Sequence, residues 1–198
     1  MEILKLAPDG PVIIQPKIFR DDRGYFFESF NDKEFREKVC DTTFVQDNES
    51  RSSYGVLRGL HYQTGDYEQA KLVRVVQGAV MDVVVDIRPG SKNYGKYYYA
   101  YLSGENHRQF FVPRGFAHGF LALRDDTIFQ YKCDNFYNKE SEGAIFFDDP
   151  DIGIPWGGWI DMSEIKLSEK DKLNLLFEDA KKANPINVDE QPSLFDEI

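Results

Sequence analysis

Hydrophobic and polar residues alternate through the middle of the chain with the two-residue period of β-strands. Two runs rich in valine, Lys71–Val76 and Ala79–Ile87, are joined through Gly78. β-Branched residues at this spacing are typical of strands, and the glycine at the joint predicts a hairpin or a sharply bent strand. Similar runs predict further short strands at residues 12–19, 24–30, 44–50, 56–63, 96–102, 109–112, 119–123, 127–131 and 144–147.

Helix signals are few and lie outside this block of strands. Residues 31–39 begin with an asparagine cap and an acidic turn, and residues 168–177 begin with the capping-box spacing Ser168-x-x-Asp171. Many short strands without intervening helices predict an antiparallel sandwich or barrel. We therefore expect a mainly β protein with a few flanking helices, a single domain over residues 1–180 and a polar tail over residues 181–198.

The charge balance restricts the partners. The chain carries 34 acidic and 24 basic residues, a net charge of −10 at pH 7. A negative overall field repels phosphate backbones and no dense basic stripe interrupts it, so we expect no nucleic-acid partner. A small anionic ligand is compatible with this balance if a few arginines and lysines converge at one site.

The cysteines and the apolar runs indicate the cellular compartment of the protein. Cys40 and Cys133 are the only cysteines and lack a CxxC spacing, which indicates reduced thiols rather than a disulfide framework or a zinc site. The first residues, MEILKLAPDGPVII, lack the basic and apolar segments of a signal peptide. No run reaches the roughly 18 apolar residues of a membrane span. We expect a cytoplasmic protein with no membrane partner.

Two of the three histidines stand next to glycines in apolar segments. His61 lies in LRGLHYQ and His118 in PRGFAHGF, each with an arginine nearby. A buried histidine needs a hydrogen-bond partner, so either one alone is equally well explained as a satisfied core residue. Two such segments together favour a shared pocket.

The same segments can be compared with the two boxes of metal-binding cupin barrels. Residues 113–118, PRGFAH, match the P-x-G-x-x-H box. The first box requires an H-x-H pair, and Gln63 stands where its second histidine belongs. Two histidines without a clear carboxylate partner form a poor zinc or iron site, so we expect no metal. What remains is a cupin-like barrel whose histidines are free for proton transfer.

Seven blocks of the sequence together resemble the dTDP-4-dehydrorhamnose 3,5-epimerase family. They follow the family's order from the N-terminal part of the chain to the last predicted helix. The blocks are DRGYFFE from Asp22, LRGLH from Leu57, KLVR from Lys71, DVVVDIR from Asp82, VPRGFAHGF from Val112, YKC from Tyr131 and LSEKD from Leu167.

The resemblance implies an epimerase without a cofactor. The family's substrate is a 4-keto-6-deoxy sugar linked to thymidine diphosphate, and its product belongs to dTDP-L-rhamnose biosynthesis. The protons at C3 and C5 both flank the ketone, so their removal gives an enolate that the protein itself can stabilise. The resemblance also implies a jelly-roll (double-stranded β-helix) barrel of the cupin type. It implies a homodimer in which an N-terminal strand is exchanged into the partner's sheet.

The resemblance implies catalytic residues position by position. His61 matches the base and Tyr131 the opposing acid, roles that suit groups with ordinary pKa values near ~6.5 and ~10. Lys71 matches a cation beside the C4 oxygen, although a solvated strand lysine fits its spacing equally well. Asp171 matches a carboxylate that orients the base, unless it closes the capping box of its own helix. Asp82, among valines, is a second candidate for a polar role near the base.

Further positions match contacts to the ligand. Arg23 and Arg58 suit bidentate binding of a diphosphate, and Tyr137 matches an aromatic residue that stacks on thymine. The other matches are Glu28, Gln46, Asp47, Asn48, His118, Glu142 and Lys170. Plain surface charge is the competing interpretation of Arg23, Glu28 and Glu142.

The sequence leaves two questions open: whether Arg58 and His61 point to the same face of their strand, and which carbons of the sugar are inverted. Arg58 and His61 differ by three, so a regular strand would point them to opposite faces unless Gly59 permits a bulge. The motifs do not separate an enzyme that inverts both carbons from one that inverts only C3 or only C5. The alternative of another class is a non-catalytic cupin that binds nucleotide sugars, which the presence of both His61 and Tyr131 disfavours.

Overall fold

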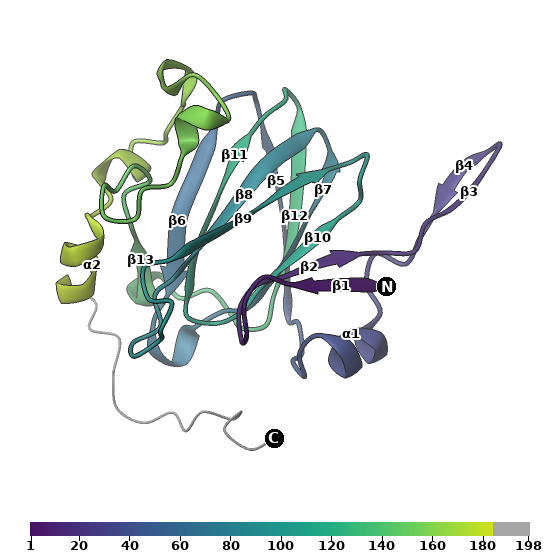
Figure 1. Ribbon diagram of the computed structural model, residues 1–198, viewed down its shortest axis with the longest axis horizontal. Coiled ribbons are helices and arrows are strands. Elements are labelled where there is room, and N and C mark those ends of the chain that lie inside the picture. Colours follow the sequence, from purple (N-terminus) through teal and green to yellow (C-terminus); the bar gives the residue numbers. More distant parts are fainter. Residues whose placement is uncertain (184–198) are drawn as a thin grey trace.

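The computed structural model describes residues 1–183, and within them two antiparallel β-sheets face each other (Figure 1). In spatial order, the six-stranded sheet contains β1 (Glu2–Lys5), β2 (Val12–Gln15), β10 (Gln109–Val112), β7 (Lys71–Gln77), β12 (Thr127–Cys133) and β5 (Gln46–Ser52). The five-stranded sheet contains β13 (Glu142–Ala144), β6 (Leu57–Gln63), β11 (Phe116–Ala122), β8 (Ala79–Asp86) and β9 (Tyr97–Ser103). A separate hairpin consists of β3 (Phe19–Asp21) and β4 (Gly24–Phe26). The prediction of a mainly β protein is confirmed.

Helices are short and lie at the periphery. The described part of the chain contains α1 (Asp32–Lys38), α2 (Phe177–Ala183) and 3-10 turns at Gly65–Tyr67, Lys139–Ser141, Trp156–Gly158, Met162–Glu164 and Asp171–Leu173. α1 begins at the predicted cap, where the Asn31 side chain accepts a hydrogen bond from Glu34 N at 3.1 Å. The helix prediction for residues 31–39 is confirmed.

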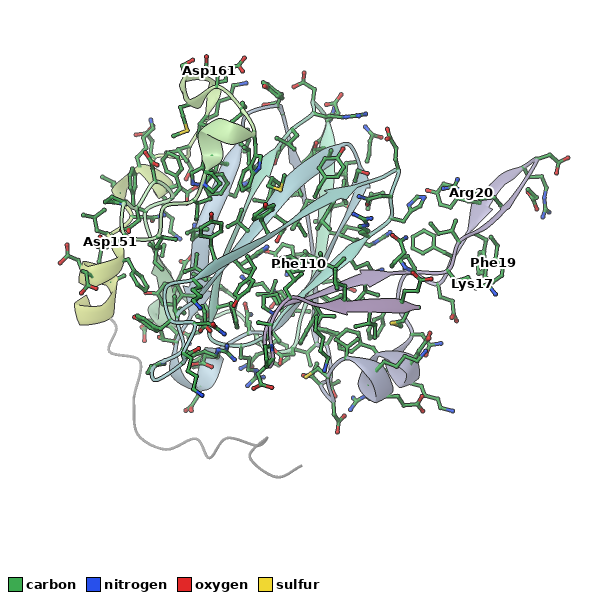
Figure 2. All side chains as sticks on the ribbon, viewed as in Figure 1. Lys17, Phe19, Arg20, Phe110, Asp151 and Asp161 are labelled. Atoms are coloured by element: carbon green, nitrogen blue, oxygen red, sulfur yellow. The ribbon has the colours of Figure 1, made fainter. Side chains whose placement is uncertain are left out.

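The central strand β8 explains the almost continuous apolar run in the sequence. Every residue of β8 is buried. Val80 and Val84 join the cluster between the two sheets, which contains Phe110 (Figure 2). Val83 and Val85 face the other way, into a cluster covered by the segment that follows β13. Burial on both faces removes the polar alternation that a half-exposed strand would show.

Residues Lys166–Leu175 form an extended strap in place of the helix predicted over residues 168–177. Parallel bridges hold the two ends of the strap: Val56 to Lys166, and Ile145 to Leu175. The helix prediction is wrong because only one 3-10 turn forms before the backbone becomes extended again at Asn174. The polar groups at the two ends of the strap bond to neighbouring segments of the barrel instead of a next helical turn.

The β3–β4 hairpin stands away from the body of the barrel, and the labelled side chains of Phe19 and Arg20 show its position (Figures 1 and 2). Its base is held by ring contacts: Tyr25 and Phe27 lie 4.5 and 5.0 Å from His107 between ring centroids. Tyr25 is 54% exposed even so, which leaves the outer part of the hairpin without a covering surface in this chain.

Two further expectations concern the ends and the membrane. Among residues 1–183, no helix is long and apolar enough to cross a membrane. The predicted boundary between residues 180 and 181 falls inside α2, and residues 184–198 of the predicted tail lie outside the described residues. The division into domain and tail therefore stays a prediction.

Candidate active site

A pocket of about 530 Å³ opens between the two sheets and is bordered on one side by the strap. It collects side chains from β5, β6, β7, β11 and β12, strands that are far apart in the sequence. Eight of the predicted site residues line it: Asn48, Arg58, His61, Lys71, His118, Tyr131, Lys170 and Asp171. Sequence blocks matched by resemblance therefore converge on one cavity.

His61 and Asp171 form a close pair at the pocket. His61 Nε2 lies 2.6 Å from Asp171 Oδ1, and Ser168 Oγ donates to the other carboxylate oxygen, Oδ2, at 2.7 Å. Burial alone would raise the pKa of Asp171, but the hydrogen bonds from His61 and Ser168 outweigh it and hold that pKa below its usual range. The carboxylate faces the histidine, while the Asp171 backbone N–H donates to Ser168 Oγ as in the first half of a capping box, so the orienting role of Asp171 stays a prediction.

Gly59 explains how Arg58 and His61 both reach the pocket despite their spacing of three. The register with β11 shifts here: His61 pairs with His118, whereas Arg58 pairs with Phe120. Gly59 has φ +141°, and a Cβ on it would lie 2.5 Å from the backbone of β11. Only glycine permits this conformation and this close approach, so the predicted bulge is present.

A second histidine–aspartate pair lies on the neighbouring strands. His118 Nε2 lies 3.0 and 3.1 Å from the two carboxylate oxygens of Asp82, whose side chain is fully buried in β8. Burial lowers the pKa of His118, and burial raises the pKa of Asp82 against the opposing effects of His118 and Lys71. Asp82 itself does not line the pocket and reaches it only through His118.

Lys71 and Tyr131 line the pocket from the opposite, six-stranded sheet. Lys71 stands on β7 beside Cys133 of β12, and burial lowers its pKa while Cys133 and Asp82 act in the other direction. Burial also raises the pKa of Tyr131, so its phenol stays protonated at neutral pH. The pocket thus presents a histidine from one sheet and a phenol from the other.

Glu142 joins the pocket rim to the strap. It accepts a hydrogen bond from Tyr137 Oη at 3.0 Å and pairs with Lys170 Nζ at 2.6 Å. Burial would raise the pKa of Glu142, but these two contacts hold it below its usual value. On the other side of Tyr137, its backbone N–H donates to Gln46, whose amide in turn donates to Asn48. These side chains form one connected polar rim.

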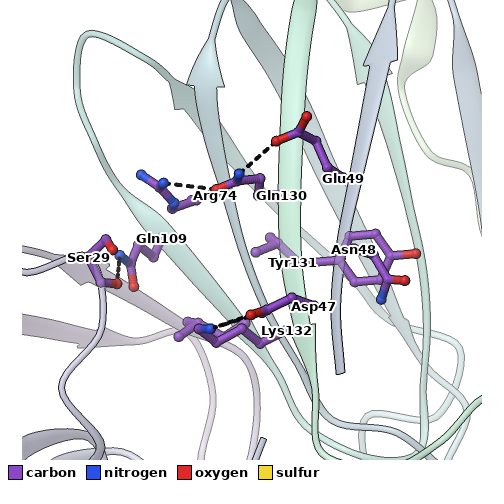
Figure 3. Close-up of a pocket in the computed structure, with 11 residues that line it drawn as sticks. Ser29, Asp47, Asn48, Glu49, Arg74, Gln109, Gln130, Tyr131 and Lys132 are labelled. Carbon is purple, nitrogen blue, oxygen red and sulfur yellow. Dashed lines mark hydrogen bonds and ion pairs between the residues drawn. The ribbon is translucent and has the colours of Figure 1, made fainter. Parts of the chain in front are cut away.

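Seven predicted residues do not line the pocket: Asp82, Gln46, Tyr137 and Glu142 are linked to it by the hydrogen bonds and ion pair described above, and three lie elsewhere. Arg23 and Glu28 belong to the protruding hairpin region and do not line the pocket of their own chain. Asp47 pairs with Lys132 at 2.8 Å in a separate pocket of about 240 Å³ on the six-stranded sheet, which Asn48 and Tyr131 also border (Figure 3). Asp47 and Asn48 are successive strand residues whose side chains point to opposite faces, so Asp47 lies away from the histidines, and its nucleotide contact stays a prediction.

The sequence interpretation missed other residues that line the main pocket. Ser50, Lys166 and Ser168 contribute to its wall, and none of them was predicted as a site residue. Ser168 carried a signal, its spacing from Asp171, but that spacing was interpreted as a helix cap. Within residues 1–183, no group of three histidines, cysteines or carboxylates is placed to hold a metal ion.

Known families and relatives were found for nearly the whole described chain. The family model described as dTDP-4-dehydrorhamnose 3,5-epimerase matches residues 5–179. The dTDP-4-dehydrorhamnose 3,5-epimerase of Methanothermobacter thermautotrophicus is 50% identical over 170 residues, which cover 85% of this chain and 90% of that relative.

Solved structures share the architecture. The dTDP-6-deoxy-D-glucose-3,5-epimerase of Legionella pneumophila Philadelphia 1, in complex with dTDP-4-keto-L-rhamnose, is 47% identical with a TM-score of 0.82, over 88% of this chain and 92% of that chain. A 3'-monoepimerase of Streptomyces bikiniensis in complex with dTDP-quinovose is 32% identical with a TM-score of 0.82, over 89% of this chain and 88% of that chain. The prediction of a cupin-like jelly-roll barrel is confirmed.

Proposed function

The chain belongs to the dTDP-4-dehydrorhamnose 3,5-epimerase family, and from this membership we propose that it converts dTDP-4-dehydro-6-deoxy-D-glucose to dTDP-4-dehydro-L-rhamnose. The conversion inverts C3 and C5, and the product serves dTDP-L-rhamnose biosynthesis. The observation that carries the proposal is the pocket in which the His61–Asp171 pair and Tyr131 come from opposite sheets.

The chemistry is proton removal beside a ketone followed by return of a proton on the other face. His61 acts as the base. Its Nε2–H donates to the ionised Asp171, so the lone pair on Nδ1 is the proton acceptor. Tyr131 acts as the opposing acid, because its phenol is protonated and stands on the other sheet. Lys71 stabilises the enolate oxygen at C4.

The remaining pocket residues bind the substrate. Arg58 and Lys170 provide the local positive charge that an acidic chain needs for a diphosphate. His118, held by Asp82, contacts the sugar, and Tyr137 stacks on the thymine base. Gln46, Asp47 and Asn48 help to hold the nucleotide, and Glu142 makes a further substrate contact.

We assign Arg23 and Glu28 to the site of a second copy of the chain, in a homodimer with exchanged N-terminal strands. The support is the position of the hairpin, which stands away from its own barrel with Arg23 exposed. Mixing inactive Arg23→Ala and His61→Ala proteins under subunit exchange should then restore activity, because mixed dimers contain one intact site. Absence of any recovery in verified mixed dimers would contradict the shared site.

NMR of the product from dTDP-4-dehydro-6-deoxyglucose tests the function directly. Inversion at both C3 and C5 is expected. Inversion at only one carbon would assign the chain to the monoepimerases, an alternative favoured by its likeness to the Streptomyces bikiniensis protein. Binding without any turnover would indicate a non-catalytic nucleotide-sugar-binding protein.

The Tyr131→Phe variant tests the two-face mechanism. Phenylalanine keeps the ring but has no proton to give, so the enolate should form and be reprotonated from the His61 side. In deuterated water, label should enter C3 or C5 of recovered substrate faster than inverted product appears, as measured by mass spectrometry and NMR. Wild type should place most label in product. Equal loss of exchange and inversion would show that Tyr131 acts before the enolate forms.

A further inference from the structure

Ser168 contacts a single aspartate twice. Its Oγ accepts a hydrogen bond from Asp171 N at 3.1 Å and donates one to Asp171 Oδ2 at 2.7 Å. The other carboxylate oxygen, Oδ1, contacts His61 Nε2 at 2.6 Å. The serine and the histidine therefore bond to different oxygens of the carboxylate, and the Asn174 side chain is a further hydrogen-bond partner of Asp171.

The strap supplies a frame for this arrangement. It is bridged to the start of β6 at one end and to the residue after β13 at the other. Inside the strap, the Asn174 side chain donates to Gly59 O at 3.2 Å, two residues before His61. The serine hydroxyl and the carboxylate are thus held on one short segment that is fastened directly to the strand of the histidine.

A carboxylate with one free oxygen can rotate about its Cβ–Cγ bond and exchange its two oxygens. A short O–H···O⁻ hydrogen bond to one oxygen opposes that rotation, and hydrogen bonds to charged groups are among the stronger ones. A fixed Oδ1 accepts from Nε2–H of the neighbouring imidazole and so selects the tautomer whose lone pair is on Nδ1.

We propose that Ser168 is a positioning residue for the epimerisation, which locks the Asp171 carboxylate so that His61 presents Nδ1 to the substrate. This role rests on the proposed function, because it requires His61 to be the base. Ser168 itself moves no proton to or from the sugar.

A double-mutant cycle tests whether Ser168 acts through Asp171. Ser168→Ala should lower kcat about 10-fold with KM unchanged within about twofold, because the lost bond orients the base and does not bind the substrate. In the Asp171→Asn background the same change should cost less than about twofold, since its target is already gone. Ser163→Ala is the matched control. Ser163 Oγ also donates to an aspartate, Asp161 Oδ1 at 2.8 Å, on an exposed turn outside the pocket, and its loss should leave kcat unchanged.

Nitrogen-15 NMR of labelled histidine gives a readout independent of turnover. In the wild type, His61 should show the Nε2–H tautomer. Ser168→Ala should weaken the hydrogen bond from Nε2–H to the carboxylate and shift the Nε2 resonance, and Ser168→Thr, which keeps the hydroxyl, should restore both the resonance and kcat.

The outcomes separate this proposal from the proposed function. A wild-type kcat in Ser168→Ala, or an additive loss in the Asp171→Asn background, would overturn the positioning role. If Ser168→Ala does not fold, failure of the folded Ser168→Thr variant to keep the Nε2 resonance and kcat overturns it as well. If the wild type inverts no carbon, or if His61→Ala keeps its activity, the proposed function fails instead.

Discussion

The two histidine–aspartate pairs contain the same residue types and lie on neighbouring strands, yet their surroundings differ. His61 keeps 32% of its side chain exposed and takes its carboxylate from the strap, outside both sheets. His118 is 7% exposed, and its partner Asp82 is fully buried within β8. His61 and His118 are directly opposite each other on the paired strands β6 and β11. The difference in burial therefore occurs between two adjacent strands.

Burial accounts for the difference in chemistry. We call His118–Asp82 the inner pair and His61–Asp171 the outer pair. In the inner pair, burial lowers the pKa of His118 and raises that of Asp82, because it disfavours the charged form of each group. In the outer pair, hydrogen bonds overcome burial and keep Asp171 ionised. An ionised carboxylate stabilises the imidazolium that forms when His61 takes a proton, whereas the buried His118–Asp82 pair is held by fixed hydrogen bonds at 3.0 and 3.1 Å. This contrast supports the proposal that the outer pair transfers protons and the inner pair orients the substrate.

His61→Ala should produce the largest effect. It should lower turnover and leave dTDP binding nearly unchanged. General-base catalysis typically contributes ~10²–10⁴-fold, and the diphosphate contacts belong to other residues. Steady-state kinetics should show a loss of this size, while calorimetric titration with dTDP should give a nearly unchanged Kd. A collapse of dTDP binding together with activity would make His61 structural and remove the contrast between the pairs.

Matched changes in the two carboxylates should separate chemistry from stability. Asp171→Asn should lower kcat by roughly 10²-fold, because the imidazolium loses its charged partner. Asp82→Asn should lower kcat less, but should decrease the free energy of unfolding by about 1–3 kcal/mol, because it alters a hydrogen-bonded pair in the core. Urea unfolding and kinetics on both variants measure the two quantities. The reverse pattern would break the comparison.

The inner histidine should make stability fall as the pH is lowered. The pKa of His118 is depressed in the folded state, so below about pH 6.5 the unfolded chain takes up a proton that the folded chain refuses. Each such histidine can contribute up to about 1.4 kcal/mol per pH unit. His107, whose pKa is lowered by burial and by Arg20 and Arg74, adds a slope of the same sign. Asp82, whose pKa is raised above its ordinary value of 3.8, adds a slope of the opposite sign above that value.

Urea unfolding between pH 5.5 and 7.5 measures that slope. His118→Asn should flatten it, and His107→Asn should remove the other contribution. A wild-type slope in His118→Asn would mean that the inner histidine gains its proton as easily in the folded chain as in the unfolded one.

Metal removal should have no effect on either pair. Both histidines have carboxylate partners, and proton transfer by His61 and Tyr131 needs no Lewis acid. Protein dialysed against a strong chelator should keep its kcat. Stoichiometric zinc or iron by elemental analysis, with activity lost on chelation and restored by that metal, would replace the proton-transfer interpretation of the two pairs.

The fold was predictable where the hydrophobic pattern was strong. The runs at residues 71–76 and 79–87 became β7 and β8. These strands lie in different sheets, so the hairpin alternative is wrong and the chain bends sharply at Gly78, which has a positive φ. β1 was missed because its side chains are mostly exposed and show no apolar alternation. β11 begins at Phe116, three residues before its prediction, because a strand buried on both faces gives no period to mark its start.

The site residues could be predicted where a single sequence motif contains them. They could not be predicted where an interaction joins segments that are far apart in the sequence. The resemblance supplied His61 and Tyr131, and the glycine bulge settled the parity of Arg58. The four-residue spacing of Ser168 and Asp171 predicted a helix cap. That spacing contains no information about β6, the distant strand whose His61 Asp171 contacts. Arg23 lies on the exposed hairpin and pairs there with Asp21, so its ligand contact stays a prediction.

The strap also sets an order of events during synthesis. Asp171 follows His61 by 110 positions and comes after every strand of both sheets. At a translation rate of about 5–20 residues per second, the carboxylate is added about one to five seconds after the last residue of β13. The nascent chain therefore contains every strand of the barrel before it contains the partner of its base. A nascent chain stopped ahead of residue 166 would contain the residues of every strand and lack Asp171.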